Sequence, residues 1–483
     1  MNMLHQRKNI QQLKQQLKES QSYAEWQKIA LKLDQLTEQQ AWKSDNSSPY
    51  FDAKLISHRL QLLQRYRLQR RIRNLIPVVF EGLSYDIANI GHPMLFTHTF
   101  VGTKTIIETY VQEMSASLEA IAHYQGDDFT HQEKLEFFRQ CQQAYGQPAL
   151  MLSGGSTLGL FHTGVCKALI DHDLLPNVIS GSSAGAITTA ALGTRSLDEF
   201  QAMITGEYLF TQALRLRKVK ELLQGGGIAD VQYLKHFLVD LLGDVTFAEA
   251  YQRSGLDINI AVAPYDPTQN SRVLNAKTAP DVLVWSAVLA SCAVPMIYPP
   301  VRLTSKRYDG EYTPYMADTK WVDGSMRHDF PREKIARLYN INYTIASQVN
   351  PHIVPFLQSD RQRYAKDVLS WTERVIRRQG KGMALSMMDF ARERTTRLPV
   401  LQRMLEHGYG IFDQHYYGDV NIIARYELQH YRYLLQNPTD QLLIKLQKEG
   451  ERATWSKISA IECHARIEKT IRHALEFLQK SAP

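Results

Sequence analysis

The sequence predicts an α/β protein whose core holds a mostly parallel sheet, with helical regions at both ends of the chain. Two differences in pattern along the 483 residues indicate this fold class. Residues 1–145 and 356–483 are polar with helical periodicity, whereas residues 146–355 contain short apolar runs separated by helical patterns. Such alternation is typical of a sheet covered by helices. We therefore expect three regions with these boundaries.

The N-terminal region is expected to be helical because its apolar residues recur on one helical face. Trp26, Ile29, Leu33 and Leu36 share such a face. Between Ala53 and Phe80 there is no acidic residue, and the segment carries seven basic ones: Lys54, Arg59, Arg65, Arg67, Arg70, Arg71 and Arg73. A basic amphipathic segment can lie on an anionic membrane surface or be a solvated helix packed by its apolar face. Both interpretations stay open.

The central region supplies the expected strands. Five apolar runs are the candidates: Ala149–Leu152, Val178–Ile179, Ile258–Val262, Val282–Leu289 and Tyr343–Ala346. Helical patterns between them predict crossover connections, which parallel strands require.

Composition narrows the classes of function. Hydrophobic residues make up 44% and charged residues 22%, which is ordinary for a globular protein. No apolar stretch approaches the ~20 residues of a spanning helix, and no secretory signal is visible, so we expect a cytoplasmic protein with at most peripheral membrane contact. The formal charge of +7 suits an acidic partner or surface, but no nucleic-acid-binding motif accompanies it. The four cysteines are scattered, and we expect neither a disulfide framework nor a metal site.

The first motif is a glycine-rich turn after the first expected strand. Gly154, Gly155 and Ser156 stand between an apolar run and a helical pattern. Glycines permit a tight turn and leave backbone N–H groups directed outward at a helix N-terminus. Such a loop can hold a phosphate or a developing oxyanion, and alone it is equally compatible with a plain turn.

The second motif is a nucleophile elbow. Gly181, Ser183 and Gly185 fit G-x-S-x-G, in which a serine occupies a strained strand-to-helix turn between small residues. One helical pattern separates Gly154 from Ser183, so the two loops form a single βαβ unit and emerge side by side. The first loop could then stabilise an oxyanion formed at Ser183. A dinucleotide site is excluded by the missing second glycine, and a P-loop by the missing G-K-[ST].

The third motif is Asp323-Gly324, which follows a short apolar approach. In isolation it is an ordinary turn aspartate. A serine nucleophile, however, needs a proton acceptor within reach, and a carboxylate of suitable pKa can serve.

Together the three motifs resemble the patatin-like phospholipase family. The resemblance implies a three-layer α/β/α core, a Ser–Asp dyad of Ser183 and Asp323, and an oxyanion loop of Gly154, Gly155 and Ser156. Ala290–Pro295 is similar to the family's A-[ST]-x-A-x-P element. The chain departs from the pattern at Ser156 and Ser325, where glycine or a small apolar residue is usual; both replacements are small.

Flanking segments resemble the triacylglycerol-lipase branch of this family, in which an uncharacterised helical region precedes the catalytic domain. They include His162 and its neighbours, Gly91–Leu95 and Gly102–Lys104. The resemblance implies a lipid ester substrate, triacylglycerol or phospholipid, and a peripheral contact with a membrane or lipid-droplet surface. It implies no cofactor and leaves the oligomeric state open.

Alternatives to this interpretation remain. An α/β-hydrolase with a Ser–Asp–His triad could use His328 or His352, which follow Asp323 in the required order. A catalytically silent lipid-surface scaffold would also suit the basic flanks. His162 is expected to be a packing or helix-start residue. His123 and Asp128 form an H-x4-D pattern of the kind found in acyltransferases, which we interpret as coincidence.

Overall fold

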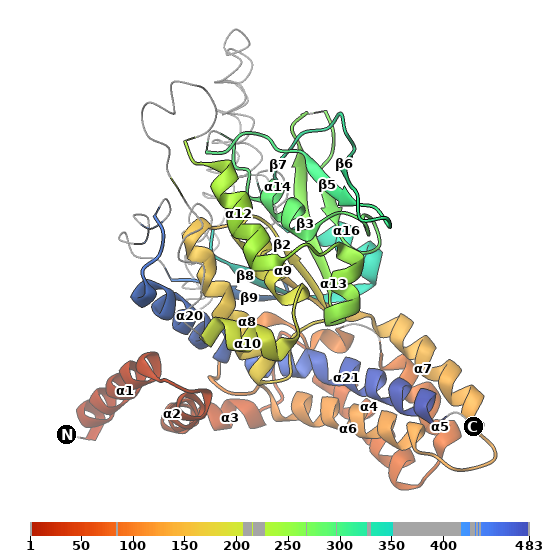
Figure 1. Cartoon of the computed structure of the whole chain (residues 1–483). Helices are drawn as coiled ribbons and strands as arrows, with labels where there is room; N and C mark the ends of the chain where they lie inside the picture. Colours follow the sequence, from red (N-terminus) through yellow and green to blue (C-terminus); the bar gives the residue numbers. More distant parts are fainter. Residues whose placement is uncertain are drawn as a thin grey trace.

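The computed structural model describes residues 2–83, 86–205, 215, 228–266, 268–295, 297–325, 330–350, 417–425, 430, 433 and 436–481. A mostly parallel sheet stands beside a bundle of helices (Figure 1). This arrangement confirms the predicted fold class of an α/β core flanked by helical regions. No helix among the described residues has the length and apolar character needed to cross a membrane.

The sheet has seven strands in the order β4-β3-β2-β1-β8-β9, with β7 also paired to β3. The run from β3 to β9 is parallel, while β4 and β7 are antiparallel to β3. The strands are β1 (Gln147–Leu152), β2 (Val178–Gly181), β3 (Asp257–Pro264), β4 (Arg272–Leu274), β7 (Trp321–Asp323), β8 (Ile341–Gln348) and β9 (Val420–Ile423). A separate hairpin pairs β5 (Leu303–Lys306) with β6 (Tyr312–Tyr315).

Helices cover both faces of the sheet, and the alternation along β1 shows why. Leu150 and Leu152 enter the large core beneath α8 and α9, whereas Ala149 and Met151 face the core beneath α16. A strand buried on both faces has a continuous apolar sequence, as in the run Ala149–Leu152 of β1. The helices of this part are α8 (Phe161–Asp171), α9 (Ala184–Gly193), α10 (Leu197–Thr205), α12 (Val231–Leu242), α13 (Phe247–Ser254), α14 (Val284–Ser291) and α16 (Arg332–Tyr339), with a 3₁₀ turn η3 (Ser156–Leu160).

One expected strand is wrong. The apolar run Val282–Leu289 forms most of α14, not a strand. Every residue of α14 is buried, so the helix has no polar face and no helical periodicity in its sequence. A short apolar run of this kind cannot be distinguished from a buried strand by pattern alone.

The N-terminal region is helical, as expected, and builds its own core. Its elements are α1 (Asn2–Glu19), α2 (Tyr23–Leu36), α3 (Gln39–Ser44), α4 (Ala53–Leu68), α5 (Ile72–Glu81), η1 (Ile87–Asn89), η2 (Pro93–Phe96), α6 (Thr105–Ala122) and α7 (His131–Tyr145). In the basic segment, Arg59 pairs with Glu81 at 3.0 Å and Arg67 pairs with Glu113. Packing within the bundle therefore accounts for these two cations.

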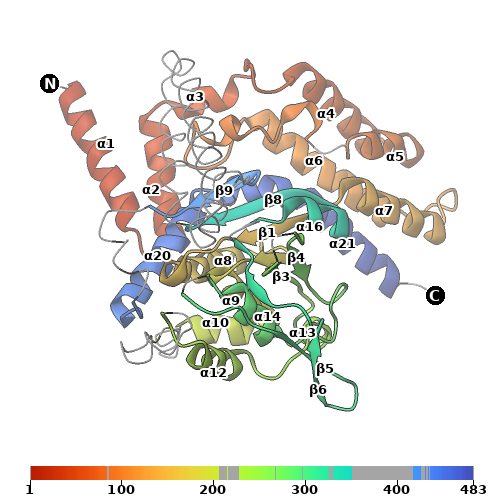
Figure 2. The ribbon, with the colours of Figure 1, turned by 90° about the horizontal axis from the view of Figure 1, so that it is seen from above.

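The C-terminal residues join the two halves of the molecule. Strand β9 extends the sheet beyond β8, and α20 (Asp440–Trp455) packs on α8 where Gly164 and Gly450 allow close approach. Helix α21 (Ile458–Lys480) adds Ile467 and Ile471 to the N-terminal core. Seen from above, α21 runs between the sheet and helices α4–α7 (Figure 2). The last part of the chain thus supports both cores.

Candidate active site

Ser183 occupies a sharp turn between β2 and α9. Its backbone has φ 51° and ψ −118°, a positive-φ conformation outside the left-handed helical region that costs a non-glycine residue about 1–3 kcal/mol. A Cβ on Gly181 would collide with the Gly185 carbonyl, and one on Gly185 would collide with the Leu152 carbonyl. Both glycines are therefore required by close packing around the turn, which is the geometry expected of the G-x-S-x-G motif.

Strand pairing brings Asp323 to the same place. Strand β2 pairs with β3 as far as Gly181, opposite Ile260, and Asp323 in β7 lies opposite Val262. Because Val262 also pairs with β4, β7 must lie on the β2 side of β3. The carboxyl ends of β7 and β2 therefore point toward each other along the same side of β3. Asp323, the last residue of β7, lies beside the residues that follow Gly181.

The Asp323 carboxyl group is fully buried, and this burial raises its pKa to about 6. Hydrogen bonds from the Ser325 N–H, at 2.8 Å to Oδ1, and from the Ser325 hydroxyl lower the pKa in part. The Ser183 hydroxyl also lies near enough to lower it, yet Oδ2 has no hydrogen-bond partner among the described residues. The Ser183 contact is thus looser than a full hydrogen bond, as is common before substrate binds.

The last residue of α14 and the residues just after it hold Ser183 and Asp323 in position. The Ser183 N–H donates to Ser291 Oγ at 2.9 Å, and Ser291 Oγ donates to the Ala261 carbonyl at 2.7 Å. The Asp323 N–H donates to the Ala293 carbonyl at 3.1 Å. Sequence reasoning assigned no role to Ser291; the only signal was its place in the A-[ST]-x-A-x-P element.

The glycine-rich loop lies against Ser183 and against Ser325, two residues after Asp323. A Cβ on Gly154 would stand 3.2 Å from the Ser325 side chain and 3.3 Å from Ser183 Cβ. A Cβ on Gly155 would stand 2.9 Å from the Val349 carbonyl. Ser156 has φ 52°, so it adopts the left-handed conformation that glycine would adopt more easily. The structure thus brings the first loop, the elbow and Asp323 together.

His162 lies beneath the loop and is fully buried, in agreement with its expected packing role. Its Nε2 lies 2.9 Å from the Ser153 carbonyl, which can only accept, so Nε2 carries the proton. Its Nδ1 then accepts from the Ser347 hydroxyl at 2.8 Å. Burial lowers the pKa of His162 to about 4, which keeps the ring neutral. The ring therefore ties the end of β1 to β8.

The other candidate residues lie elsewhere. His328 and His352 fall outside the described residues. His123 packs on Phe477 with ring centroids 4.5 Å apart, whereas Asp128 accepts from the Tyr124 hydroxyl at 2.8 Å. His123 and Asp128 thus have separate partners, in keeping with a coincidental pattern. Among the described residues, no cluster of three or more His, Cys, Asp or Glu side chains could hold a metal ion.

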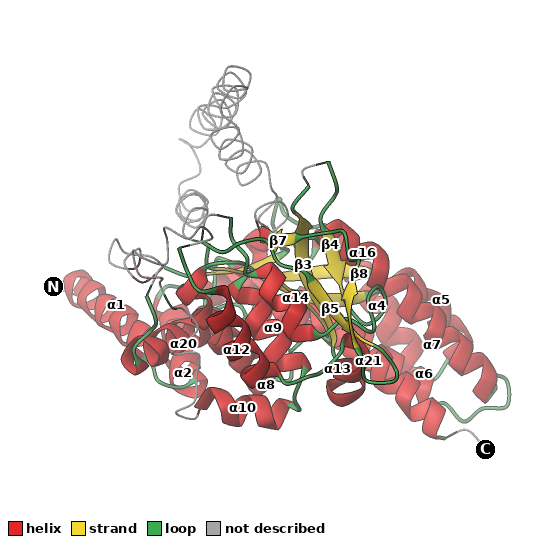
Figure 3. Ribbon diagram, turned by 45° about the horizontal axis from the view of Figure 1, so that its top comes forward, coloured by secondary structure: helices red, strands yellow, loops and turns green. Residues whose placement is uncertain are grey.

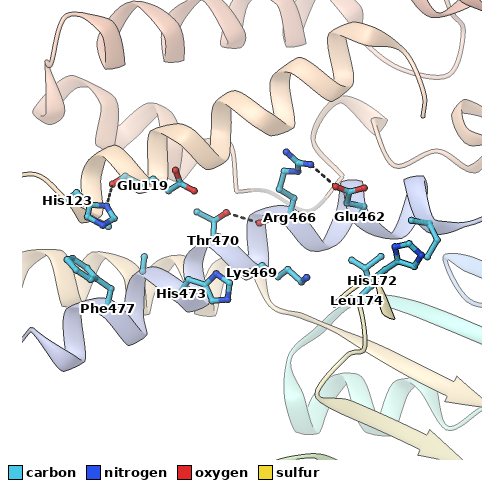
Figure 4. Close-up of a pocket in the computed structure, with 13 residues that line it drawn as sticks. Glu119, His123, His172, Leu174, Glu462, Arg466, Lys469, Thr470, His473 and Phe477 are labelled. Carbon is cyan, nitrogen blue, oxygen red and sulfur yellow. Dashed lines mark hydrogen bonds and ion pairs between the residues drawn. The ribbon is translucent and has the colours of Figure 1, made fainter. Parts of the chain in front are cut away.

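His123 also lines a cavity of about 580 Å³ between α6, α21 and the end of α8 (Figure 4). Two of its cations already have anionic partners: Arg466 pairs with Glu462 at 2.7 Å and Lys469 pairs with Asp173 at 2.6 Å. None of the three motifs contributes to its lining. This cavity is therefore separate from the site around Ser183.

Comparison with known proteins places these features in a family. Residues 150–334, which include all three motifs, match the model of patatin-like phospholipases, and residues 3–143 match a domain of unknown function, DUF3336. The chain is 31% identical over 486 residues to triacylglycerol lipase ptl3 of Schizosaccharomyces pombe, covering 97% of this chain and 98% of that protein.

Two further relatives are longer than this chain. It is 32% identical to triacylglycerol lipase 4 of Saccharomyces cerevisiae, covering 95% of this chain and 52% of that protein. It is 30% identical to triacylglycerol lipase SDP1L of Arabidopsis thaliana, covering 95% and 57%. The chain thus spans little more than half of either protein. From its match to ptl3 over nearly the full length of both proteins, the chain belongs to the patatin-like phospholipase family, in the branch that carries an N-terminal DUF3336 domain.

Proposed function

We propose that this chain hydrolyses acyl ester bonds of lipids, with Ser183 as nucleophile and Asp323 as its base. The observation that carries the proposal is the meeting of a strained serine with a buried carboxyl group whose burial raises its pKa to about 6. A carboxylate of that pKa accepts a proton more readily than an ordinary aspartate and is still ionised at neutral pH.

The reaction follows from these positions in two halves. Asp323 takes the hydroxyl proton as Ser183 Oγ attacks the ester carbonyl, and the alcohol leaves with that proton. Asp323 then takes a proton from water as the water attacks the acyl-enzyme; the bond between Ser183 Oγ and the acyl carbon breaks, the proton returns to Oγ, and the fatty acid is released. The loop of Gly154, Gly155 and Ser156 is proposed to stabilise the oxyanion in both halves. His162 and Ser291 position this loop and the elbow.

We infer a neutral glyceride as the first substrate to test, because the relatives are named triacylglycerol lipases. A phospholipid presents the same acyl ester, so the carbonyl chemistry alone does not separate the two. Either substrate resides in a lipid interface, and a peripheral contact with a membrane or lipid droplet is part of the proposal.

The test is labelling with a fluorophosphonate probe, which reacts with activated serines. Wild type, Ser183→Ala and Asp323→Asn are incubated with the probe, and the labelled peptide is mapped by mass spectrometry. We expect labelling at Ser183 in wild type, none in Ser183→Ala and strongly slowed labelling in Asp323→Asn. Folding of each variant is checked by circular dichroism. A folded wild type that takes up no probe would refute the proposal and favour a silent lipid-surface scaffold.

A Ser–Asp–His triad is tested with His328→Ala and His352→Ala. The dyad predicts that both variants retain wild-type labelling rates. Loss of labelling in either folded variant would replace the dyad with a triad.

A further inference from the structure

A second groove lies at the edge of the sheet, between β4 and α16. Its volume is about 470 Å³. Figure 3 shows β4 and α16 next to each other at this edge. Its polar lining consists mainly of Ser271, Arg272, Asn275, Thr278, Lys334 and Arg337. None of the motifs assigned above contributes to this lining.

The groove is cationic. Arg272, Lys334 and Arg337 line it, and no acidic side chain is among the described residues that line it. None of these three cations forms an ion pair with a described residue. Lys334 Nζ donates instead to the Ser271 carbonyl and, at 3.0 Å, to Ser271 Oγ. Partial burial and the nearby charge of Arg272 lower the pKa of Lys334.

The rest of the groove is built from satisfied polar groups and apolar side chains. The Asn275 amide donates to Asn259 Oδ1 at 2.7 Å, and the Thr278 hydroxyl donates to the Val273 carbonyl at 2.9 Å. Ile335 and Leu338 complete the lining from α16, and Leu338 is 39% exposed. The groove therefore offers uncompensated positive charge beside an apolar wall.

Its position relates it to the active site. Arg272 lies opposite Val262 in β3, and Asp323 lies opposite the same Val262 from the other side. The Arg272 guanidinium group stands 5.8 Å from the ring centroid of Trp321, two residues before Asp323. A ligand in the groove would thus sit only two strands away from the strand that carries Asp323.

We propose that this groove binds a phosphate group, presented by a free anion or by the headgroup of an anionic phospholipid. Two guanidinium groups and one ammonium group line the same groove and offer several donors, which suits an anion with several acceptor oxygens. The exposed side chain of Leu338 suits the apolar acyl part of a lipid attached to that phosphate. Occupied by a headgroup, the groove would hold this edge of the sheet, two strands from that of Asp323, at an anionic lipid surface.

The test measures phosphate binding by the full chain and by charge variants. Inorganic phosphate is titrated calorimetrically at constant ionic strength, and the double variant Lys334→Gln/Arg337→Gln is compared with wild type. A matched control, Lys32→Gln/Lys445→Gln, removes the same charge from exposed positions in α2 and α20. We expect at least tenfold weaker binding in the groove variant and less than twofold change in the control. Arg272→Gln provides an independent third variant.

A second arm separates the two sources of phosphate. Flotation with vesicles of phosphatidylcholine, with and without phosphatidic acid, is measured for the same proteins. Binding that needs phosphatidic acid and the groove cations, with or without binding of free phosphate, supports a headgroup site. Binding of free phosphate alone supports a small-anion site. Binding of neither, or equal losses in the groove and control variants, overturns the inference.

This inference and the proposed hydrolysis fail in different assays. Binding can be measured in Ser183→Ala, whatever the role of Ser183. Conversely, the groove variants should hydrolyse a soluble short-chain ester within twofold of the wild-type rate, because the three cations lie outside the proposed catalytic machinery.

Discussion

Two buried ionisable side chains, one in the N-terminal helical region and one in the sheet, have opposite environments. Lys104 at the start of α6 is fully buried, and its Nζ donates to the Trp42 and Asp45 carbonyls at 2.7 and 2.6 Å while facing the Trp42 ring at 4.0 Å. Asp323 is equally buried, but its Oδ2 has no hydrogen-bond partner among the described residues. The Lys104 ammonium group has hydrogen-bond partners and joins α3 to α6, whereas one carboxyl oxygen of Asp323 has none among the described residues.

The difference shows where the fold tolerates a loss of stability. A buried charge with partners stabilises its surroundings, whereas a buried charge with an open position lowers stability. The strained backbone of Ser183 adds to that cost in the same place. Such concentration of strain and uncompensated charge is typical of a site selected for reactivity.

The largest expected effect comes from Asp323→Asn. If Asp323 is the base, as proposed, its removal should lower kcat/KM on the order of 10⁴-fold. Because the raised pKa means that ionised Asp323 is disfavoured by the fold, the same change should raise the free energy of unfolding by about 3 kcal/mol at pH 8. Ester hydrolysis and urea denaturation measure the two effects. If Asp323→Asn loses both activity and stability, buried Asp323 stabilises the fold as Lys104 does, and the contrast between the two residues is wrong.

The pH dependence of wild type tests the same carboxyl group. Asp323 must be ionised to accept a proton, so kcat/KM should fall about tenfold for each pH unit below about 6 and level off above it. The stability gain of Asp323→Asn is full above about pH 6, where the carboxyl group of folded wild type is ionised. The gain vanishes below about pH 4, where this group is protonated in both the folded and unfolded states. If kcat/KM instead falls only below about pH 4, burial does not raise the pKa of Asp323.

Ser291→Ala tests how the elbow is held. It removes the hydroxyl that accepts the Ser183 N–H, and we expect kcat to fall about 10–100-fold with little change in KM. Ser286→Ala is the matched control, because Ser286 lies in α14 as well, is fully buried and accepts the Thr304 N–H at 2.8 Å. Both variants should lose about 1–2 kcal/mol of stability. If Ser291→Ala and Ser286→Ala lower kcat equally, Ser291 contributes to packing and has no specific role in positioning Ser183.

The smallest effect on activity is expected for Lys104→Met. The variant leaves two backbone carbonyls without their donor and should lower the free energy of unfolding by about 1–3 kcal/mol. Hydrolysis by the folded fraction should stay within twofold of wild type. Lys32→Met, at an exposed lysine of α2, should change neither quantity. A catalytic defect in Lys104→Met would mean that the helical bundle takes part in the reaction.

Most of the fold class could be predicted from local pattern, and the failures have a common cause. Strands β1, β2, β3 and β8 were visible as apolar runs because strands buried on both faces carry few polar residues. Helix α14 is buried all round and looked the same, so its run was assigned to a strand. Strand β9 and helix α20 showed no sign in sequence of belonging beside the sheet, because their partners lie far away along the chain.

The sequence by itself determined the family, the glycine-rich loop, the elbow and the Asp323-Gly324 turn, because close backbone packing restricts each of those positions to a few small or special residues. Only the tertiary structure decided how they meet: β7 enters beyond the end of β2, Ser291 holds the Ser183 N–H, and His162 ties β1 to β8. It also decided the environment of each charged group. Lys104 has hydrogen-bond partners, Asp323 Oδ2 has none among the described residues, and Lys334 lies beside the like charge of Arg272. The physical reason is that burial and electrostatic environment arise from contacts between residues distant in sequence, which no local pattern encodes.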